Sequence, residues 1–423
     1  MAAETDRPDA APAGPRTGSP PGAPPAPIGW RRPHVSTLPA SGAWRPSRPA
    51  GDRQFMRMAV ERPFVLEGGG QLRDITVAFE TWGRLADDGG NAVLLCHAVT
   101  GDAHAAGTSG PGQPTEGWWD PLVGPGRTID TDRCFVVCAN VLGGCQGSTG
   151  PASTRADRPK PYGSSFPVVS IRDMVRCQAK LADVLGVDRW LSVIGGSMGG
   201  MQVLEWGVMY PDRVRSLVPI ATCAAATAQQ IAYWSTGRRA IVLDPGWQGG
   251  DYYDAPAGQG PHGGLALARM ISQITFRSEQ VFNDRFGRDV VESLGGAFEM
   301  WQRFEVERYL AYHGDKLVRR FDANSYLLLT KAMDLHDLGR KRGGVDVALG
   351  RIAAPTLTMG VNSDVLYPAR QQQELCEAIA AGGNPARYVE IDSPHGHDAF
   401  LLEVDQVSEH IATFLHDVEK DHA

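Results

Sequence analysis

A serine flanked by glycines is the part of this chain whose residue types and spacing most directly suggest chemistry. The segment Gly195-Gly196-Ser197-Met198-Gly199 follows a short apolar run and precedes apolar residues that recur at helical spacing. Strand, Gly-x-Ser-x-Gly and helix in that order predict a nucleophile elbow, a tight turn that exposes a reactive serine. Glycines are needed there because side chains beside so sharp a turn would collide. A glycine-rich turn that merely links a strand to a helix is the alternative, and both flanks count against it.

A serine hydroxyl needs a general base, and the base needs a partner that orients it. Asp364 and a loop with two histidines, His395 and His397, each follow an apolar run predicted as a strand. Reactive groups of an open α/β sheet gather outside the carboxyl ends of its strands, so these groups can meet Ser197. The predicted triad is Ser197, Asp364 and His397, and His397 is preferred because Gly396 beside it lets the chain turn. Surface histidines in a polar loop are the alternative interpretation.

Two backbone N–H groups are predicted to stabilise the oxyanion. One belongs to Met198, directly after the nucleophile. The other is expected from the loop after the apolar run Ala92–Cys96, where His97-Ala98-Val99 stands, and Val99 is the residue chosen. His97 itself is interpreted as a residue that braces this loop, not as a catalyst.

Strand-like and helix-like segments alternate over much of the chain. Predicted strands cover residues 75–81, 92–96, 134–139, 191–194, 214–221, 356–361 and 387–391, and predicted helices cover residues 170–185 and 404–418. Such alternation favours a mostly parallel sheet with helices on both faces. Combined with the order Ser…Asp…His along the chain, it predicts the α/β-hydrolase fold.

The alternation stops between residues 223 and 349, which are interpreted as a helical lid over the strand ends. Helices are predicted at 265–275 and 300–311, with a Gly/Pro/Asp-rich loop at 244–264. Residues 51–222 and 350–423 would form the hydrolase core. Residues 1–50 hold 12 of the 30 prolines and are predicted to be a disordered tail, because such a segment buries too little apolar area to offset its ordering entropy.

Composition excludes several classes of partner. The net charge is -7 and no block of Lys or Arg stands out, so no nucleic-acid partner is expected. No apolar run approaches the length of a membrane span, and no signal peptide is recognised, so no membrane partner is expected. Seven cysteines, an odd number, indicate reduced thiols and a cytoplasmic location. A second glycine-rich loop, residues 143–151, lacks the Lys of a phosphate-binding P-loop.

Seven segments resemble the homoserine O-acyltransferases, specifically the homoserine O-acetyltransferases of the α/β-hydrolase fold. They are LLCHAVTGDAH (94–104), NVLGGCQGSTGPAS (140–153), FPVVSIRDMV (166–175), GGSMGGMQVLEW (195–206), GLALAR (264–269), NSDVLYP (362–368) and GHDAF (396–400). The resemblance implies the same catalytic triad, Arg269 and Asp398 as substrate-binding residues, and a homodimer joined through the lid. It also implies L-homoserine and acetyl-CoA as substrates, with acetyl-CoA a co-substrate. No bound cofactor and no metal are expected.

The chemistry of the substrate agrees with this resemblance. Homoserine is a zwitterion, so its site needs a cation for the carboxylate, which Arg269 can grip bidentately, and an anion for the ammonium, which Asp398 can supply. Arg238 is a second candidate, and Arg239 stands where the family usually has a neutral residue. Alternatives are a homoserine or serine O-succinyltransferase, a serine esterase or thioesterase, and a non-catalytic binding protein of the same fold.

Overall fold

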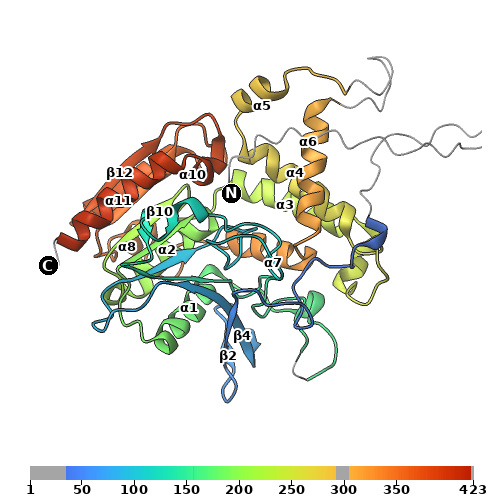
Figure 1. The fold of residues 1–423 in the computed structure, drawn as a ribbon, viewed down its shortest axis with the longest axis horizontal. Helices are drawn as coiled ribbons and strands as arrows, with labels where there is room; N and C mark the ends of the chain where they lie inside the picture. The colour runs from blue at the N-terminus through green and yellow to red at the C-terminus, as the bar shows by residue number, and fades with distance from the viewer. Residues whose placement is uncertain (1–34, 156, 292–303, 421–423) are drawn as a thin grey trace, which may run out of the picture.

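One eight-stranded sheet organises the protein. The computed structural model describes residues 35–155, 157–291 and 304–420 (Figure 1). The strand order is β1-β4-β8-β5-β9-β10-β11-β12. The pairs β1–β4 and β4–β8 are antiparallel, and all the others are parallel, as the alternation predicted. These strands are β1 (Gln54–Met58), β4 (Ile75–Trp82), β5 (Ala92–Cys96), β8 (Phe135–Ala139), β9 (Ser192–Gly196), β10 (Leu217–Ile220), β11 (Thr356–Val361) and β12 (Ala386–Ile391).

Short strands pair outside this sheet. They are β2 (Phe64–Val65) with β3 (Gln71–Leu72), and β6 (Val123–Gly124) with β7 (Ile129–Asp130). Neither these strands nor β1 was predicted. The two-residue strands are too short for an alternating pattern to be recognised.

Helices cover both faces of the sheet, which explains why its central strands are apolar on both sides. Successive residues of β5 enter different cores: Leu94 packs in the core that contains α1 and α2, while Leu95 packs in the core that contains α11. The helices of this part are α1 (Ile171–Leu185), α2 (Met198–Met209), α9 (Ala369–Ala381), α10 (Ala399–Leu402) and α11 (Val404–Lys420). α1 begins at a capping box, in which Ser170 and Asp173 each accept a hydrogen bond from the other's backbone N–H.

Helices fill the segment between β10 and β11, and Figure 1 shows α3 to α6 gathered beside the sheet. They are α3 (Ala228–Val242), α4 (His262–Phe276), α5 (Glu279–Phe286), α6 (Glu305–Val318), α7 (Ala323–Asp334) and α8 (Val345–Leu349). The predicted helix 265–275 lies within α4. Of the predicted helix 300–311, residues 300–303 lie outside the described residues, and the remainder lies almost wholly in α6. We call residues 223–349 the lid.

The N-terminal segment does not follow its prediction throughout. Residues 1–34 lie outside the described residues, but residues 35–44 contribute buried positions to the body, whereas residues 45–49 are exposed, so a disordered tail that reaches residue 50 is wrong for residues 35–44. Ser41 is buried and its Oγ donates to Asp322 Oδ1 at 2.7 Å, while the backbone N–H of Trp44 donates to the Cys145 carbonyl at 2.9 Å. A Cβ on Gly42 would lie 2.6 Å from the Phe321 nitrogen. These partners are remote in sequence, so composition could not reveal them.

Deleting residues 1–45 is therefore expected to lower the melting temperature by several degrees, because a buried hydrogen bond typically contributes about 1 kcal/mol and buried apolar contacts are lost as well. Deleting residues 1–34 removes none of the contacts made by Ser41 to Trp44 and is the matched control. Thermal melts of the two truncated proteins and the full chain measure the difference. Equal melting temperatures for both truncations would show that the packed segment adds no stability.

Candidate active site

Ser197 occupies the turn between β9 and α2 in a backbone conformation that few non-glycine residues adopt. Its φ is 58° and its ψ is -122°, and its side chain is buried. Such a conformation costs about 1–3 kcal/mol and persists only when neighbours hold it. The Ser197 N–H donates to the Ile220 carbonyl at 2.9 Å, and the Thr222 hydroxyl donates to the Ser197 carbonyl at 2.9 Å. The end of β10 and the residues after it therefore fix the strained turn.

The glycines of the elbow are required by close approach of other segments. A Cβ on Gly196 would lie 2.5–2.8 Å from ring atoms of Phe400, and one on Gly199 would collide with the Cys96 carbonyl. Phe400 belongs to α10, just after the histidine loop, and Cys96 ends β5. The absence of these side chains thus lets both the histidine loop and the predicted oxyanion loop pack directly against the serine turn.

His397 and Asp364 form a buried hydrogen-bonded pair. His397 Nδ1 lies 2.7 Å from Asp364 Oδ2, and the other carboxylate oxygen accepts the N–H groups of Leu366 and Tyr367 at 2.8 and 2.9 Å. A carboxylate held by these donors accepts the Nδ1 proton, which leaves Nε2 as the atom that can take a proton. The other candidate, His395, is 41% exposed, and its nearest carboxylate, that of Glu403, is 3.9 Å away.

The surroundings of His397 shift its pKa in opposite directions. Burial among the rings of Phe276, Tyr367 and Phe400 favours the neutral imidazole and lowers the pKa. The charge and hydrogen bond of Asp364 and the charge of Asp398 favour the imidazolium, and together they outweigh burial, so the pKa is raised. A general base must be neutral to act, so a raised pKa moves the loss of activity to higher pH.

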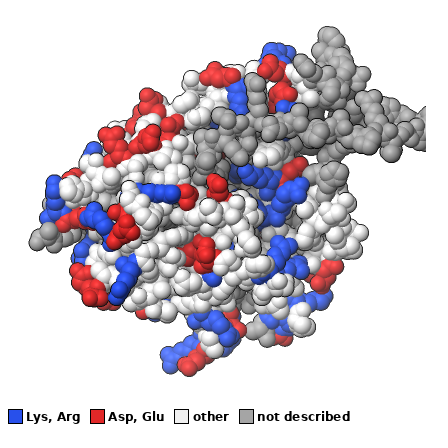
Figure 2. All heavy atoms as spheres, in the orientation of Figure 1, with Lys and Arg blue, Asp and Glu red and all other residues white. Residues whose placement is uncertain are grey.

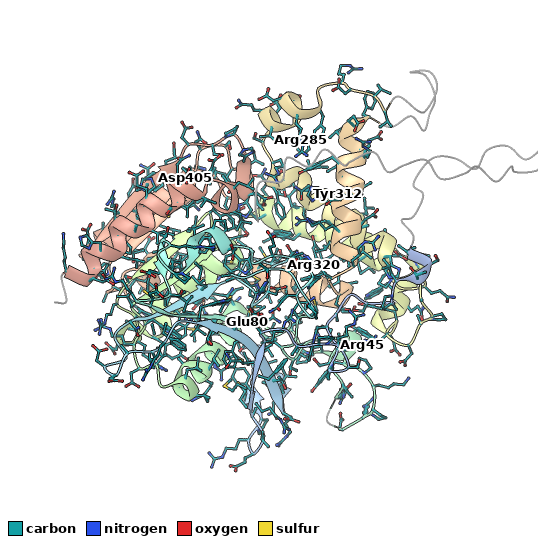
Figure 3. The ribbon with its side chains drawn as sticks, viewed as in Figure 1. Arg45, Glu80, Arg285, Tyr312, Arg320 and Asp405 are labelled. Carbon is teal, nitrogen blue, oxygen red and sulfur yellow. The ribbon has the colours of Figure 1, made fainter. Side chains whose placement is uncertain are left out.

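Asp398→Asn is accordingly expected to move the acid limb of the kcat/KM profile to lower pH. Removing a nearby negative charge destabilises the imidazolium, so the pKa of His397 falls and neutral base persists in more acidic solution. The profile should be measured for cleavage of an activated ester, a reaction that requires only the predicted nucleophile and base. Asp405→Asn, at an exposed site on α11 (Figure 3), is the control and should leave the limb in place. A limb unmoved in Asp398→Asn would contradict the electrostatic argument.

His97 holds the turn that contains the predicted oxyanion donor Val99. The Val141 N–H donates to His97 Nε2 at 3.2 Å, so Nδ1 carries the proton and donates to the Ala98 carbonyl at 2.8 Å. Gly101 N–H donates to the same carbonyl at 2.9 Å. Because the Ala98–Val99 peptide is trans, fixing its carbonyl also fixes its N–H in the opposite direction. Burial lowers the pKa of His97, which favours the neutral ring. The geometry agrees with a bracing role.

Met198, the other predicted donor, begins α2 and lies close to this turn. Cys96 pairs with Gly195 across β5 and β9, and the Gln202 side chain donates to the Met198 carbonyl at 3.2 Å. The N–H of Met198 belongs to the first turn of α2, where helix N–H groups lack partners within the helix. The turn 98–101 and the helix N-terminus therefore sit at the same edge of the sheet as Ser197.

Asp398 is paired with a cation that sequence analysis missed. Arg277, which caps α4, places Nη2 3.3 Å from Asp398 Oδ2, and both side chains are largely buried. The histidine loop packs on this end of α4: Gly396 has φ 68°, and a Cβ there would lie 2.9 Å from the Phe276 carbonyl oxygen. Arg277 follows Arg269 by eight residues, close to two helical turns, and that spacing is the signal that could have revealed it.

Arg269 and Arg238 stand in different environments. The Arg269 guanidinium lies over the Phe276 ring, 5.1 Å from its centroid; burial lowers its pKa, and the charge of Asp398 acts in the opposite direction. Among the described residues Arg269 has no ion-pair partner within 4 Å. Arg238 instead forms an ion pair with Asp334, which joins α3 to α7 within the lid. Its charge is thus already compensated by a residue of the lid.

Known proteins are similar to this chain in sequence and in fold. The α/β hydrolase fold family matches residues 91–404. A homoserine O-acetyltransferase of Moorella thermoacetica is 53% identical over 356 residues, covering 84% of this chain and 94% of that protein. One of Thermobifida fusca is 52% identical over 374 residues, covering 88% and 96%. The chain belongs to the homoserine O-acetyltransferase family.

Solved structures place this family member beside both transferases and esterases. The crystal structure of a homoserine O-acetyltransferase from Bacillus anthracis has a TM-score of 0.78 at 27% identity and covers 86% of this chain and 97% of that one. The crystal structure of esterase E22 has a TM-score of 0.78 at 29% identity and covers 86% and 99%. Likeness of fold therefore does not separate transfer from hydrolysis. None of the helices in the described part of the chain is long and apolar enough to cross a membrane.

Proposed function

We propose that the protein transfers an acetyl group from acetyl-CoA to the hydroxyl of L-homoserine by a ping-pong mechanism with an acetyl-Ser197 intermediate. Family membership at about half identity over most of the chain supports this reaction. The observation that carries the choice of an amino-acid acceptor is the set of charged side chains beside the base. Asp398 follows His397 directly and pairs with Arg277, which caps α4, and Arg269 lies within α4.

In the first half-reaction, Ser197 Oγ attacks the thioester carbonyl while His397 Nε2 takes the hydroxyl proton, and Asp364 stabilises the resulting imidazolium. The N–H groups of Met198 and Val99 stabilise the oxyanion of the tetrahedral intermediate. The C–S bond then breaks, His397 returns its proton to the thiolate, and CoA leaves. The acetyl group is now an ester of Ser197.

In the second half-reaction, Arg269 binds the carboxylate of homoserine and Asp398 its ammonium, which places the hydroxyl next to His397. His397 takes the hydroxyl proton, the alkoxide attacks the acetyl-serine, and the proton returns to Ser197 as O-acetylhomoserine departs. The product would enter methionine biosynthesis. Arg238 is a less favoured substrate ligand, since its charge is matched by Asp334.

Hydrolysis by an esterase of the same fold is the second candidate, and the TM-score to esterase E22 is the observation that favours it. Incubation with acetyl-CoA, with and without homoserine, separates the two, with thiol release and products measured together. Transfer predicts O-acetylhomoserine and thiol release that depends on homoserine. Acetate as the main product in both samples would establish hydrolysis. Parallel reactions with succinyl-CoA and with serine test the choice of donor and acceptor.

We also propose a cytoplasmic homodimer joined through the lid. The apolar side chains of Leu267 and Ile274 are 42% and 52% exposed and lie about two turns apart on α4, and Leu243 at the end of α3 is 71% exposed. Seven free cysteines, six of them buried, support a reducing compartment. Sedimentation of the wild type and of Leu267→Asp tests the dimer, since a charge in a buried interface should yield monomers.

A further inference from the structure

A side chain of the lid contacts the turn 98–101, which contains the proposed oxyanion donor Val99. Arg320 lies between the end of α6 and the start of α7, and its Nη1 donates to the Thr100 carbonyl at 2.8 Å. In Figure 3 Arg320 is labelled between Tyr312 on α6 and Glu80 on β4, where the lid meets the sheet. Figure 2 shows Lys and Arg side chains gathered on this face, although the net charge of the protein is negative.

Hydrogen bonds fix the main chain of Arg320 on both its carbonyl and its N–H side, and this fixes the position from which the side chain extends. Its carbonyl accepts the Gln146 side-chain amide, and its N–H donates to the Leu317 carbonyl at 3.0 Å. Arg53 Nη2 in turn donates to Gln146 Oε1 at 3.3 Å. A Cβ on Gly42 would lie 2.8 Å from the Arg320 nitrogen, so the N-terminal segment covers this point too.

The contact continues through two peptide groups toward the reacting carbonyl. Arg320 donates to the carbonyl of the Thr100–Gly101 peptide, and the N–H of that same peptide donates to the Ala98 carbonyl at 2.9 Å. Ala98 C=O and Val99 N–H belong to one peptide. The guanidinium therefore stands at the start of a hydrogen-bonded chain whose last group is the proposed oxyanion donor. Chains of this kind polarise each successive donor, and a charged first donor strengthens them.

We infer that Arg320 is a positioning residue that orients and polarises the Val99 N–H. The geometry of the oxyanion site would then depend on the contact between the lid and the turn 98–101. The inference rests on the proposed function, because it takes Val99 as an oxyanion donor. Both half-reactions pass through an oxyanion at this place, so both should weaken together when Arg320 is lost. Binding of homoserine should change much less than either rate constant, since its carboxylate is assigned to Arg269, on which Arg320 acts through its charge.

The test compares Arg320→Gln and Arg320→Lys with Arg319→Gln, which removes the charge of the exposed neighbouring residue. Acetylation of Ser197 by p-nitrophenyl acetate is the reaction, because this ester requires neither CoA nor homoserine recognition. In Arg320→Gln the rate constant of the burst should fall about ten- to a hundred-fold at unchanged amplitude, since loss of a whole oxyanion donor costs about a hundred- to a thousand-fold. Arg320→Lys should retain more activity, and Arg319→Gln should match the wild type.

The acetyl-enzyme carbonyl supplies a readout that a purely structural role would not change. An oxyanion site polarises this carbonyl and lowers its infrared stretching frequency, so Arg320→Lys, and Arg320→Gln if it folds, should show a higher frequency than the wild type. Bursts equal to that of Arg319→Gln, an unshifted frequency, or an effect confined to the KM for homoserine would overturn the inference. Failure of the wild type to acetylate homoserine would refute the proposed function instead. The burst measured with p-nitrophenyl acetate would still test whether Arg320 acts on Val99 through the hydrogen-bonded chain.

Discussion

Ser197→Ala is expected to reduce acetyl transfer by at least about 10⁴-fold while the fold survives. Without the proposed nucleophile no acetyl-serine can form. The rate enhancement that remains is the part supplied by oxyanion stabilisation and substrate binding. His397→Ala should be nearly as damaging, because His397 is the proposed base of both half-reactions. Steady-state thiol release with acetyl-CoA and homoserine measures the loss, and circular dichroism with thermal melting checks the fold.

His395→Ala is the matched control for the base. His395 is the neighbouring histidine of the same loop, but it is 41% exposed and is not bonded to Asp364. Its loss should lower the rate only a few-fold. A larger loss in His395→Ala than in His397→Ala would exchange their roles, and substantial activity in Ser197→Ala would refute Ser197 as the nucleophile.

The parts of the fold that sequence could predict are those governed by local patterns. The run Ala92–Cys96 is continuous and apolar because β5 is buried on both faces, and the structure gives the same bounds. Gly195 to Gly199 predicts the elbow because a sharp turn demands glycine wherever another segment approaches closely. The contact of Asp364 with His397 could also be anticipated, since both follow parallel strands whose carboxyl ends share one edge.

The features that sequence analysis missed depend on partners far away along the chain. Ser41 bonds Asp322 across 281 positions, and nothing near Ser41 marks it as buried. Arg320 reaches Thr100 across 220 positions, from a helix end that looks like ordinary charged surface. An isolated arginine in a sequence is most often solvated. Only the packing of the lid against the sheet shows which of its arginines lie near the candidate active site.

The pairing of Arg277 with Asp398 sharpens the expectation for the acceptor site. A lone buried aspartate beside His397 would be costly, and Arg277 offsets part of that cost while leaving Asp398 lone pairs for an ammonium. Arg269 has no such partner among the described residues, so its guanidinium is available for a carboxylate. The two charges can therefore bind the two ends of a zwitterion without exchanging existing ion pairs.

Arg269→Ala and Asp398→Asn are therefore expected to separate the two half-reactions. With acetyl-CoA alone, both variants should still release a burst of CoA equal to the enzyme concentration, because Ser197, His397 and the proposed oxyanion donors are unchanged. With homoserine, kcat/KM for the acceptor should fall about 10²–10³-fold, the effect of losing one side of a buried charged contact. Rapid mixing with detection of free thiol measures both quantities in one experiment.

The measurement belongs at a pH above the acid limb of all variants, because Asp398→Asn is also expected to lower the pKa of His397. Arg239→Ala on α3 and Asp405→Asn on α11 remove exposed charges of the same kinds and should behave as the wild type. Slow hydrolysis of acetyl-CoA should remain in Arg269→Ala and Asp398→Asn, since the attack of water requires neither of these two charged contacts. Loss of the burst itself would assign these residues to acylation or folding, and the two-ended binding of homoserine would then be wrong.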